Sequence, residues 1–432
     1  MAEGVSLELR HQAMEIFRYA LAVSQVGAAM DRSVRFVDGV MMVDGYRYVL
    51  GEYERVVVIA IGKAAGTMIA ALLRQAADAG SRFEGIVVGW FEDSEMPQGF
   101  RGYRGGHPSP NEASVAGAVD VLATLRSLTA RDLVIFLISG GGSSMMELFL
   151  DEGASLEMMT ATHKALVECG APIALMNAVR KHLSAVKGGR LAEAAAPAEQ
   201  LTLLVSDVPE GELDALASGP TMPDRSSVAD VARIAVEYGL DIAINALVET
   251  PKAGDAVFAR SRWSVLLNSS SLEESAMSRA EDFGWRVVID NRCDDWSAED
   301  AAWYLVGRAR ELRREGGKVC LLSAGEVTVR VPQGASGRGG RNQHFCLLCS
   351  EWIAGGEMVV LSGGSDGIDG NSPAAGAVVD GSTVARALAA GYPVADALAK
   401  FDAYGLLERL GEDVTIGATG NNLRDLRILL VP

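Results

Sequence analysis

The feature that most constrains the fold is an alternation of short apolar segments with longer amphipathic ones. The apolar segments are brief, rich in β-branched residues and bounded by polar or glycine-containing sequence, as strands buried in a parallel sheet are. In the first half of the chain they are Val56–Ile61, Ile86–Trp90, Leu133–Ser139 and Leu201–Ser206. Stretches with helical spacing, such as Ala64–Ala77 and Ser114–Leu128, lie between them. This order predicts right-handed βαβ units in an α/β protein.

A second alternation begins after Thr250–Asp255, whose sequence TPKAGD is typical of a linker. The helical pattern before it runs from about Pro223 to Leu247. The predicted elements after it are strands Trp263–Leu267, Arg286–Ile289, Val319–Ser323, Val327–Val331, Met358–Leu361 and Ile428–Val431, with helices Leu272–Phe283 and Ala298–Glu315. A chain of 432 residues is too long for one ordinary core. We therefore expect two α/β domains, residues 1–250 with a mostly parallel, Rossmann-like or flavodoxin-like sheet, and residues 251–432, smaller and mixed.

Charge and cysteine content narrow the classes of partner. A formal net charge of −17 repels nucleic acid and anionic membranes at long range, so neither is an expected partner. The five cysteines are odd in number and mostly scattered, as in reduced cytosolic proteins. The N-terminal segment lacks the apolar core of a secretory signal, and no uncharged apolar run approaches the ~18 residues of a membrane span. We expect a cytoplasmic protein with a local basic pocket for any anionic ligand; a homodimer is left open.

In open parallel sheets, ligands bind in the loops at the carboxyl ends of the strands. After the strand VVVIAI come Gly62 and Lys63, which begin the sequence GKAAG. The glycine allows a tight turn into a helix, whose N–H groups and the adjacent lysine charge form a small anion site. The loop is not a Walker A motif, because Ala64 stands where that motif has Ser or Thr. A lysine that only caps the sheet edge is the alternative.

The loop after the most apolar strand is rich in glycine. From Ser139 onward it reads Gly140, Gly141, Gly142, Ser143 and Ser144. Three consecutive glycines let backbone N–H groups converge on a phosphate, and two hydroxyl groups can add hydrogen bonds. This loop predicts a phosphate or ligand site, with a structural tight turn as the alternative.

A cluster of cations stands out in this acidic chain. The sequence RKHLSAVKGGR begins at Arg180 and holds four Lys and Arg residues. On a helix, Arg180 and Lys187 share a face. Lys187 is followed by Gly188, and a basic cluster that ends in glycine predicts anion binding, whereas an ordinary charge run is a solvated helix face. His182 is interpreted as a packing or hydrogen-bonding residue.

Acidic residues follow other predicted strands. Asp207 comes directly after LTLLVS, where a carboxylate is costly unless it has a partner, a metal or a catalytic role. It suits Mg²⁺ ligation or removal of a hydroxyl proton. Glu326 follows VCLLSAG, and the loop GRGGRNQ carries Arg341 and Asn342. Asp366, in SDGIDG, is either a cation ligand or part of a turn.

Taken in order, these motifs resemble the class II glycerate kinases, a family also known as hydroxypyruvate reductases of tartrate utilisation, whose C-terminal part is the MOFRL domain. The resemblance spans nearly the whole chain and rests on the segments IGKAAGTM, GGHPSPNEAS, ISGGGSSMME, MNAVRKHLSAVKGGRLA, SDVPEGELDALASGPTMPD, SAGEVTVRV, GRGGRNQ, SGGSDGIDGNSPAAGAVVDG and ATGNNLRDLRILLV. It implies two α/β domains with the active site in the cleft between them and a MOFRL-like region at about 318–431. The implied reaction is ATP-dependent phosphorylation of D-glycerate to 2-phosphoglycerate with Mg²⁺.

Matched motif to motif, the important lysine, arginine and central acid of that family fall on Lys63, Arg341 and Asp207, and its Gly-Glu motif falls on Glu326. Two segments depart from the family: GATGNN replaces the commoner G-P-T-G-T-N, and FDAYGLLERLG replaces a typical N-D-S-Y-x-F-F stretch. These departures leave a related small hydroxy acid open as the substrate. The chief alternative is an NAD(P)H-dependent hydroxypyruvate reductase, but GKAAG does not match the G-x-G-x-x-G that a nicotinamide cofactor calls for. The third hypothesis is a catalytically silent sensor, which would not need this full set of Lys, Asp, Glu and Arg.

Overall fold

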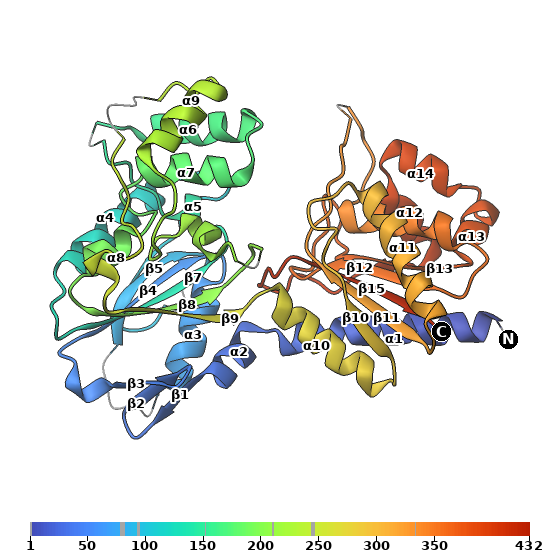
Figure 1. The fold of residues 1–432 in the computed structure, drawn as a ribbon, viewed down its shortest axis with the longest axis horizontal. Coiled ribbons are helices and arrows are strands. Elements are labelled where there is room, and N and C mark those ends of the chain that lie inside the picture. Colours follow the sequence, from blue (N-terminus) through green and yellow to red (C-terminus); the bar gives the residue numbers. More distant parts are fainter. Residues whose placement is uncertain are drawn as a thin grey trace. The chain divides into compact units, whose positions relative to one another are not determined.

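The computed structural model describes residues 2–77, 83–92, 96–151, 153–209, 211–242, 247–332 and 334–432. They form two compact units, each around one six-stranded sheet (Figure 1). Unit 2 is the continuous segment Val26–Leu266, and unit 1 combines Met1–Gln25 with Leu267–Pro432. The α/β class with two sheets is therefore confirmed.

The sheet of unit 2 has the strand order β6-β5-β4-β7-β8-β9. Its strands are β4 (Val56–Gly62), β5 (Phe83–Gly89), β6 (Phe100–Tyr103), β7 (Leu133–Ser139), β8 (Glu199–Val205) and β9 (Ser261–Leu267). The five strands from β6 to β8 pair in parallel. Every residue of β4 and β7 is buried, as expected of continuous apolar runs covered on both faces.

Helices cover both faces of this sheet. The helices of unit 2 are α2 (Val26–Ser33), α3 (Ala65–Gln75), α4 (Glu112–Arg126), α5 (Gly142–Met145), α6 (Leu156–Glu168), α7 (Ile173–Leu183), α8 (Arg190–Ala195) and α9 (Val228–Glu237). Side chains alternate between the faces of a strand, and Ile59 and Phe136 share one core with residues of α4 and α8. Helix α3 packs on β4, β5 and β7 and contributes nothing to that core, so it covers the other face. Helices α7 and α9 share a separate small core.

A small antiparallel sheet in unit 2 was not predicted. Strands β1 (Val34–Val37), β2 (Val40–Val43) and β3 (Tyr46–Val49) form a meander. The turns are Asp-Gly pairs, and Asp38 and Asp44 both have positive φ. Asp-Gly between short strands is a hairpin signal, so these two dipeptides were the information available in the sequence.

The sheet of unit 1 is mixed, in the order β10-β11-β15-β12-β13-β14. Its strands are β10 (Arg286–Ile289), β11 (Val319–Ala324), β12 (Val359–Gly364), β13 (Gly376–Asp380), β14 (Asp413–Val414) and β15 (Asp425–Val431). Only β10 and β11 pair in parallel, and the other neighbours are antiparallel.

Two pairs of helices sandwich this sheet (Figure 1). Helices α1 (Ala2–Val23) and α10 (Ser269–Asp282) pack together on one face, and α11 (Ala298–Arg314) and α12 (Arg341–Ile353) on the other. The helices α13 (Thr383–Ala389), α14 (Val394–Lys400) and α15 (Ala403–Leu410) extend the core around α12.

The structure differs from the sequence expectations at three places. It divides the chain at 25/26 and 266/267 rather than at 250/251, because α1 packs on the sheet of unit 1 and β9 joins the sheet of unit 2. The predicted strand Val327–Val331 is wrong, since only Thr328 makes an isolated bridge, to Ser297. The helical pattern 223–247 yields helix only at Val228–Glu237, and residues 243–246 lie outside the described part.

Within the described residues, no helix has both the length and the hydrophobicity to cross a bilayer.

Helix α1 provides a test of how the units are composed. Phe17 is fully buried, and its ring lies so close to Gly363 of β12 that a Cβ at Gly363 would come within 2.6 Å of it. Phe17→Ala should destabilise unit 1 by about 3–5 kcal/mol, through lost burial and an unfilled cavity. Hydrogen exchange should show faster opening of β12 and β15, with β4 and β7 little changed.

The matched control is Leu7→Ala on the same helix, where the side chain is 71% exposed and the change should stay within about 0.5 kcal/mol. Faster exchange confined to β4 and β7 in Phe17→Ala would contradict the assignment of α1 to unit 1.

Candidate active site

Three loops of unit 2 converge at the carboxyl edge of its sheet. Gly62 is the last residue of β4, Gly140 directly follows β7, and Asp207 lies two residues beyond β8. The three strands are neighbours and run parallel, so their carboxyl ends share one edge. The prediction that these residues lie at one sheet edge is confirmed.

Two glycines permit the close approach of these loops. Gly62 has φ +110°, and a Cβ there would lie 2.6 Å from the hydroxyl oxygen of Ser139. A Cβ on Gly140 would collide with the carboxylate of Asp207. Any larger residue at either position would push the loops apart, so the sequence places the Asp207 carboxylate directly against the glycine-rich backbone.

Ser139 holds the first two loops together. Its buried hydroxyl donates to the carbonyl of Ile61 at 3.2 Å and accepts from the N–H of Ala64 at 3.0 Å. The backbone N–H of Lys63 donates to the carbonyl of Gly140 at 2.9 Å. Ser139 was predicted as a ligand contact; in the structure its hydroxyl instead fixes the position of Lys63.

The side chain of Lys63 lies over the glycine-rich loop. Its Cγ and Cε are 3.0 and 3.1 Å from where a Cβ of Gly141 would stand, and its Nζ is 5.6 Å from the centroid of the Trp90 ring. His107 lies on the same glycine, with its Cδ2 3.2 Å from that position. Desolvation and, second, the charge of Lys63 lower the pKa of His107, which favours a neutral imidazole at neutral pH.

Sequence reasoning assigned no role to Trp90 or His107. The available signals were weak: Trp90 ended a predicted strand, and His107 lies in the segment GGHPSPNEAS. Only the fold brings both next to Lys63.

The two serines after the glycines have different surroundings. Ser143 Oγ is 2.7 Å from Ser218 Oγ, whereas Ser144 Oγ turns back to the carbonyl of Gly141 at 3.4 Å. Ser218 and the preceding Ala217 have φ of +60° and +49°, a conformation that is strained for residues with a Cβ. Such strain is concentrated at functional sites, where the surrounding structure holds it in place. A Cβ on Gly142 would lie 2.7 Å from that of Ala217, so this segment packs directly on the loop.

Lys187 is buried in an ion pair. Its side chain is 1% exposed, and its Nζ is 2.5 Å from Oε2 of Glu147. His163 and Ser184 bond the same carboxylate, at 2.8 and 2.6 Å. Burial acts to raise the pKa of Glu147, but the charge of Lys187 and the His163 contacts outweigh it and hold this pKa at about 2. The Lys187 ammonium is thus engaged with an ionised partner inside the protein.

Gly188 continues this structural role. It has φ +58°, and a Cβ there would lie 2.9 Å from Cγ2 of Thr250. Lys181, from the same cluster, pairs with Asp214 and Asp224 at 2.9 and 3.0 Å. Two of the four cations of the cluster therefore balance buried carboxylates.

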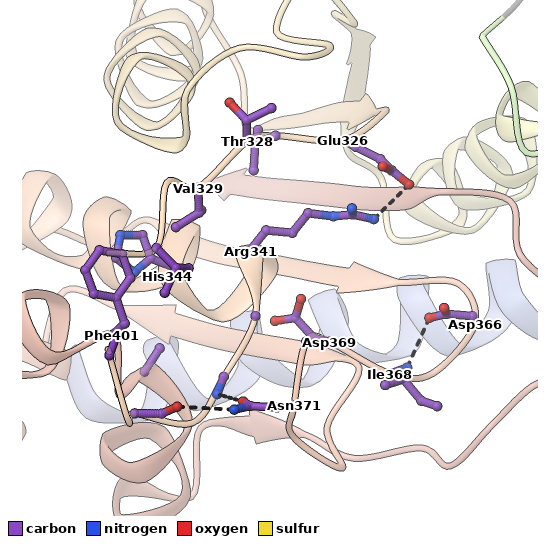
Figure 2. Close-up of a pocket in the computed structure, with 18 of the residues that line it drawn as sticks. Glu326, Thr328, Val329, Arg341, His344, Asp366, Ile368, Asp369, Asn371 and Phe401 are labelled. Carbon is purple, nitrogen blue, oxygen red and sulfur yellow. Dashed lines mark hydrogen bonds and ion pairs between the residues drawn. The ribbon is translucent and has the colours of Figure 1, made fainter. Parts of the chain in front are cut away.

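Unit 1 contains a pocket of about 770 Å³ around Arg341 (Figure 2). Arg341 is the first residue of α12 and forms a bidentate pair with Asp425, Nε to Oδ2 at 2.6 Å and Nη2 to Oδ1 at 3.1 Å. Its Nη2 also lies 2.8 Å from Glu326 Oε1. Burial raises the pKa of Glu326 above its usual range. The Gly-Glu motif and the GRGGRNQ loop, which the sequence singled out separately, therefore meet at this ion pair.

Asp369 supports this arrangement. In the sequence it was, like Asp366, either a cation ligand or part of a turn. Its carboxylate accepts from the backbone N–H groups of Asn342 and Gln343, at 3.2 and 2.9 Å, and so caps the start of α12. Burial raises the pKa of Asp369 to about 7. Asn342 is itself buried, and its side-chain oxygen accepts from Ser362 at 2.6 Å. Asp366 lines the pocket and accepts from the N–H of Ile368 at 3.1 Å, as in an Asx turn (Figure 2).

The pocket has an apolar side opposite its charged one. His344 and Phe401 stack with ring centroids 5.4 Å apart, and Val329 lies near them (Figure 2). Sequence reasoning missed both rings, although Phe401 opens the divergent segment FDAYGLLERLG. One wall therefore suits a flat apolar group, and the other offers carboxylate acceptors and a guanidinium.

The residues present fit Mg²⁺ only as part of a larger ligand set. Within the described residues, no three His, Cys, Asp or Glu side chains gather as metal ligands. Mg²⁺ usually keeps several waters and binds one or two carboxylates together with substrate phosphates. Asp207 in unit 2 and Asp366 in unit 1 each have the donor chemistry for this.

Comparison with known proteins gives consistent results. Residues 12–250 match the family model described as a domain of unknown function, DUF4147, and residues 319–425 match the MOFRL family. A D-glycerate 2-kinase of Thermotoga maritima is 36% identical over 88% of this chain and 91% of its own. A glycerate 2-kinase of Pyrococcus horikoshii is 30% identical over 99% of this chain and 98% of its own. An Agrobacterium vitis protein that carries the provisional name hydroxypyruvate reductase is 36% identical over 87% of both chains.

Solved structures agree with these sequence comparisons. The crystal structure of a glycerate kinase from Thermotoga maritima has a TM-score of 0.86 and 33% identity, covering 98% of this chain and 100% of that one. A Pyrococcus horikoshii protein has a TM-score of 0.83 and 29% identity, covering 98% of both chains.

The buried pair of Lys187 and Glu147 leads to a stability prediction. Lys187→Met leaves the Glu147 carboxylate without its main counter-charge, so the free energy of unfolding should fall by about 3–5 kcal/mol. The double variant Glu147→Gln with Lys187→Met removes both charges and should recover most of the loss. Urea unfolding of the full chain measures both effects.

Lys164→Met, at an exposed lysine of α6, is the control and should stay within about 0.5 kcal/mol. Normal stability of Lys187→Met together with a raised KM would show that Lys187 contacts a ligand instead.

Proposed function

Because the chain belongs to the glycerate 2-kinase family, we propose that it transfers the γ-phosphoryl group of ATP to D-glycerate, giving 2-phosphoglycerate and ADP. The proposal rests mainly on the position of Lys63. Its side chain lies over the glycine-rich loop, at the sheet edge where the Asp207 carboxylate also lies. Phosphoryl transfer needs mainly positioning and neutralisation of charge, and this edge offers a cation, a carboxylate and backbone N–H groups.

Lys63 is proposed to stabilise the charge on the transferred group. Its ammonium is a compact point charge on a chain braced by Gly141 and Trp90. Such a fixed cation acts most strongly where charge is redistributed in the transition state, so it lowers the barrier rather than only tightening binding. The backbone of Gly140 to Gly142 and the hydroxyl of Ser144 are proposed to bind phosphate or substrate oxygens beside it. Ser143, whose Oγ lies 2.7 Å from Ser218 Oγ, is proposed to hold the loop that presents them.

Asp207 is proposed to act on the substrate hydroxyl or on the metal. As a base, its carboxylate takes the hydroxyl proton while the substrate oxygen bonds to the γ-phosphorus, and the bond to the β–γ bridging oxygen breaks with its electrons leaving on ADP. As a ligand, it holds Mg²⁺, which when bound neutralises phosphate charge. Its position against Gly140 suits either role.

The pocket of unit 1 is proposed to bind the nucleotide. The His344–Phe401 stack and Val329 offer a surface for a flat base, and the carboxylates of Glu326 and Asp366 can accept hydrogen bonds from ribose hydroxyls. Asp366 is the second candidate for the metal. Arg341 is proposed to neutralise phosphate charge, and Asn342 to contribute by fixing the start of α12. ATP as substrate and five free cysteines fit the predicted cytoplasmic location.

The activity itself is tested by measuring ADP release with D-glycerate, hydroxypyruvate, tartronate and related acids, alongside NADH oxidation with hydroxypyruvate. We expect Mg²⁺-dependent ADP release with D-glycerate and no NADH oxidation. NADH oxidation without ADP release would favour the reductase and overturn the kinase.

The role of Lys63 is tested by substitution. Lys63→Ala should lower kcat by about 10²–10³-fold with a modest change in KM, because the interaction strengthens in the transition state. Lys63→Arg should not restore kcat, since a planar fork does not fit the space of an ammonium over Gly141. Steady-state kinetics with glycerate measure this, with the exposed Lys164→Ala as the control.

Asp207→Asn should be nearly inactive in either role, and excess Mg²⁺ separates them, because partial rescue indicates a ligand and no rescue indicates a base. Near-normal turnover in both Lys63→Ala and Asp207→Asn would show that the site is wrong even if the reaction is right.

A further inference from the structure

One cation of the basic cluster is not engaged with a carboxylate. Lys181 and Lys187 form ion pairs with acidic residues within 3.0 Å. Arg190 lies 3.8 Å from the carboxylate of Glu193 and also donates to the carbonyls of Val248 and Glu249. Arg180 has no carboxylate within 4.0 Å among the residues that the structure describes. Its guanidinium donates through Nη1 to Oδ1 of Asn177, at 3.2 Å.

The opposite edge of this guanidinium lacks a partner. Nε of Arg180 is shielded from solvent and makes no hydrogen bond to any described residue. A buried donor on a charged group is costly when unpaired, so its presence calls for an explanation. Nε and Nη2 form the edge that binds an oxyanion in a bidentate manner, and Arg341 uses the same edge for Asp425.

Three buried or partly buried hydrogen bonds connect Arg180 with the glycine-rich loop. Oδ1 of Asn177 accepts from Arg180 and also from Ser218 Oγ, at 3.2 Å each. Ser218 Oγ lies 2.7 Å from Ser143 Oγ, and Ser143 directly follows Gly142 in the glycine-rich loop. The hydroxyl proton of Ser218 is donated to Asn177, so the hydrogen bond between the two serines must use the proton of Ser143. Both hydroxyl protons in this series of hydrogen bonds are therefore assigned.

The strain at this point in the fold supports a functional role. Ser218, the middle residue of this series of hydrogen bonds, is fully buried and has φ +60°, as noted above. Its hydrogen-bond partners Asn177 and Ser143 belong to α7 and to the glycine-rich loop. Ser218 therefore links three separate segments of the polypeptide, its own included. An energetically costly conformation kept beside a positioned guanidinium is the kind of arrangement that pre-organises a binding site.

We propose that Arg180 binds an oxyanion of one of the substrates, beside the glycine-rich loop, with Asn177 as the residue that positions its guanidinium. The oxyanion is the carboxylate of the hydroxy acid or a phosphate of the nucleotide, which share this chemistry. The side chain is partly exposed, so the proposal requires the guanidinium to turn about its contact with Asn177 until Nε and Nη2 face the ligand. The inference rests on the proposed kinase function and names a subsite of it; it replaces Lys187 by Arg180 as the anion-binding member of the cluster.

The test uses the full chain with Arg180→Gln and Arg180→Lys, varying D-glycerate and ATP separately. Loss of a charge-assisted hydrogen bond should raise one KM about 10- to 100-fold and leave the other within about twofold. A raised KM for D-glycerate identifies the carboxylate, and a raised KM for ATP identifies the phosphate. Arg180→Lys keeps the charge without the fork, so it should recover only part of the loss.

The control is Arg233→Gln, at an exposed arginine of α9 in the same unit, which should leave both KM values unchanged. Thermal unfolding checks that each variant is folded, and if Arg180→Gln is not, Arg180→Lys carries the comparison. Unchanged KM values and kcat in a folded variant would overturn the subsite while leaving the kinase intact.

Calorimetric binding of D-glycerate and of ADP separates this inference from the proposed function. Binding to the wild type that is lost in Arg180→Gln supports the subsite even if no ADP is released. Equal binding by wild type and variant, or binding of neither ligand, overturns it.

Discussion

The register of β4 against β7 is the constraint on which the candidate site of unit 2 depends. Ile61 pairs with Ile138, so Gly62 comes level with Ser139 at the end of the ladder. Because Gly62 has no side chain, the hydroxyl of Ser139 can reach the backbone on both sides of it. Lys63 then begins at a fixed point over Gly141. A slip of one residue would turn every buried side chain of β4 to the other face, so the apolar core and the site require the same register.

Charge balance is the second organising influence. In a chain of net charge −17, cations are scarce, and many are engaged with acids that the fold has buried. Glu147 and Asp425 are examples, each fully desolvated beside a Lys or an Arg. Removing one member of such a pair leaves a charge in a medium that solvates it poorly. Local basic character consequently depends on which cations the fold leaves without a buried acidic partner, and not on clusters as they stand in the sequence.

The sequence was informative where structure is local and less so where partners are distant. The buried strands β4 and β7 were predicted to within one residue, since a continuous apolar run between polar boundaries has few alternatives. The position of the loops at one edge of the sheet could also be predicted, because the carboxyl ends of parallel strands lie at the same edge. Ser139, Lys187 and Asn342 have the chemistry of ligand contacts, but their internal partners could not be anticipated from the sequence. Folding alone brings the backbone of Ile61 to Ser139, Glu147 to Lys187 and Ser362 to Asn342. Helix α1 packs on strands that lie more than 300 residues further along the chain, and no local pattern records that.

The composition of unit 1 from both ends of the chain has a consequence for synthesis on the ribosome. Helix α1 is made before the rest of unit 1, and strand β12, which covers Phe17, follows it by more than 300 residues. At 5–20 residues per second, the wait is roughly 20–80 s. Unit 2 is continuous and is complete long before, so it can fold while the apolar face of α1 is still unprotected. During that interval the nascent chain presents this face to chaperones and proteases. The face is covered only when β15 has left the ribosome and the sheet of unit 1 can form.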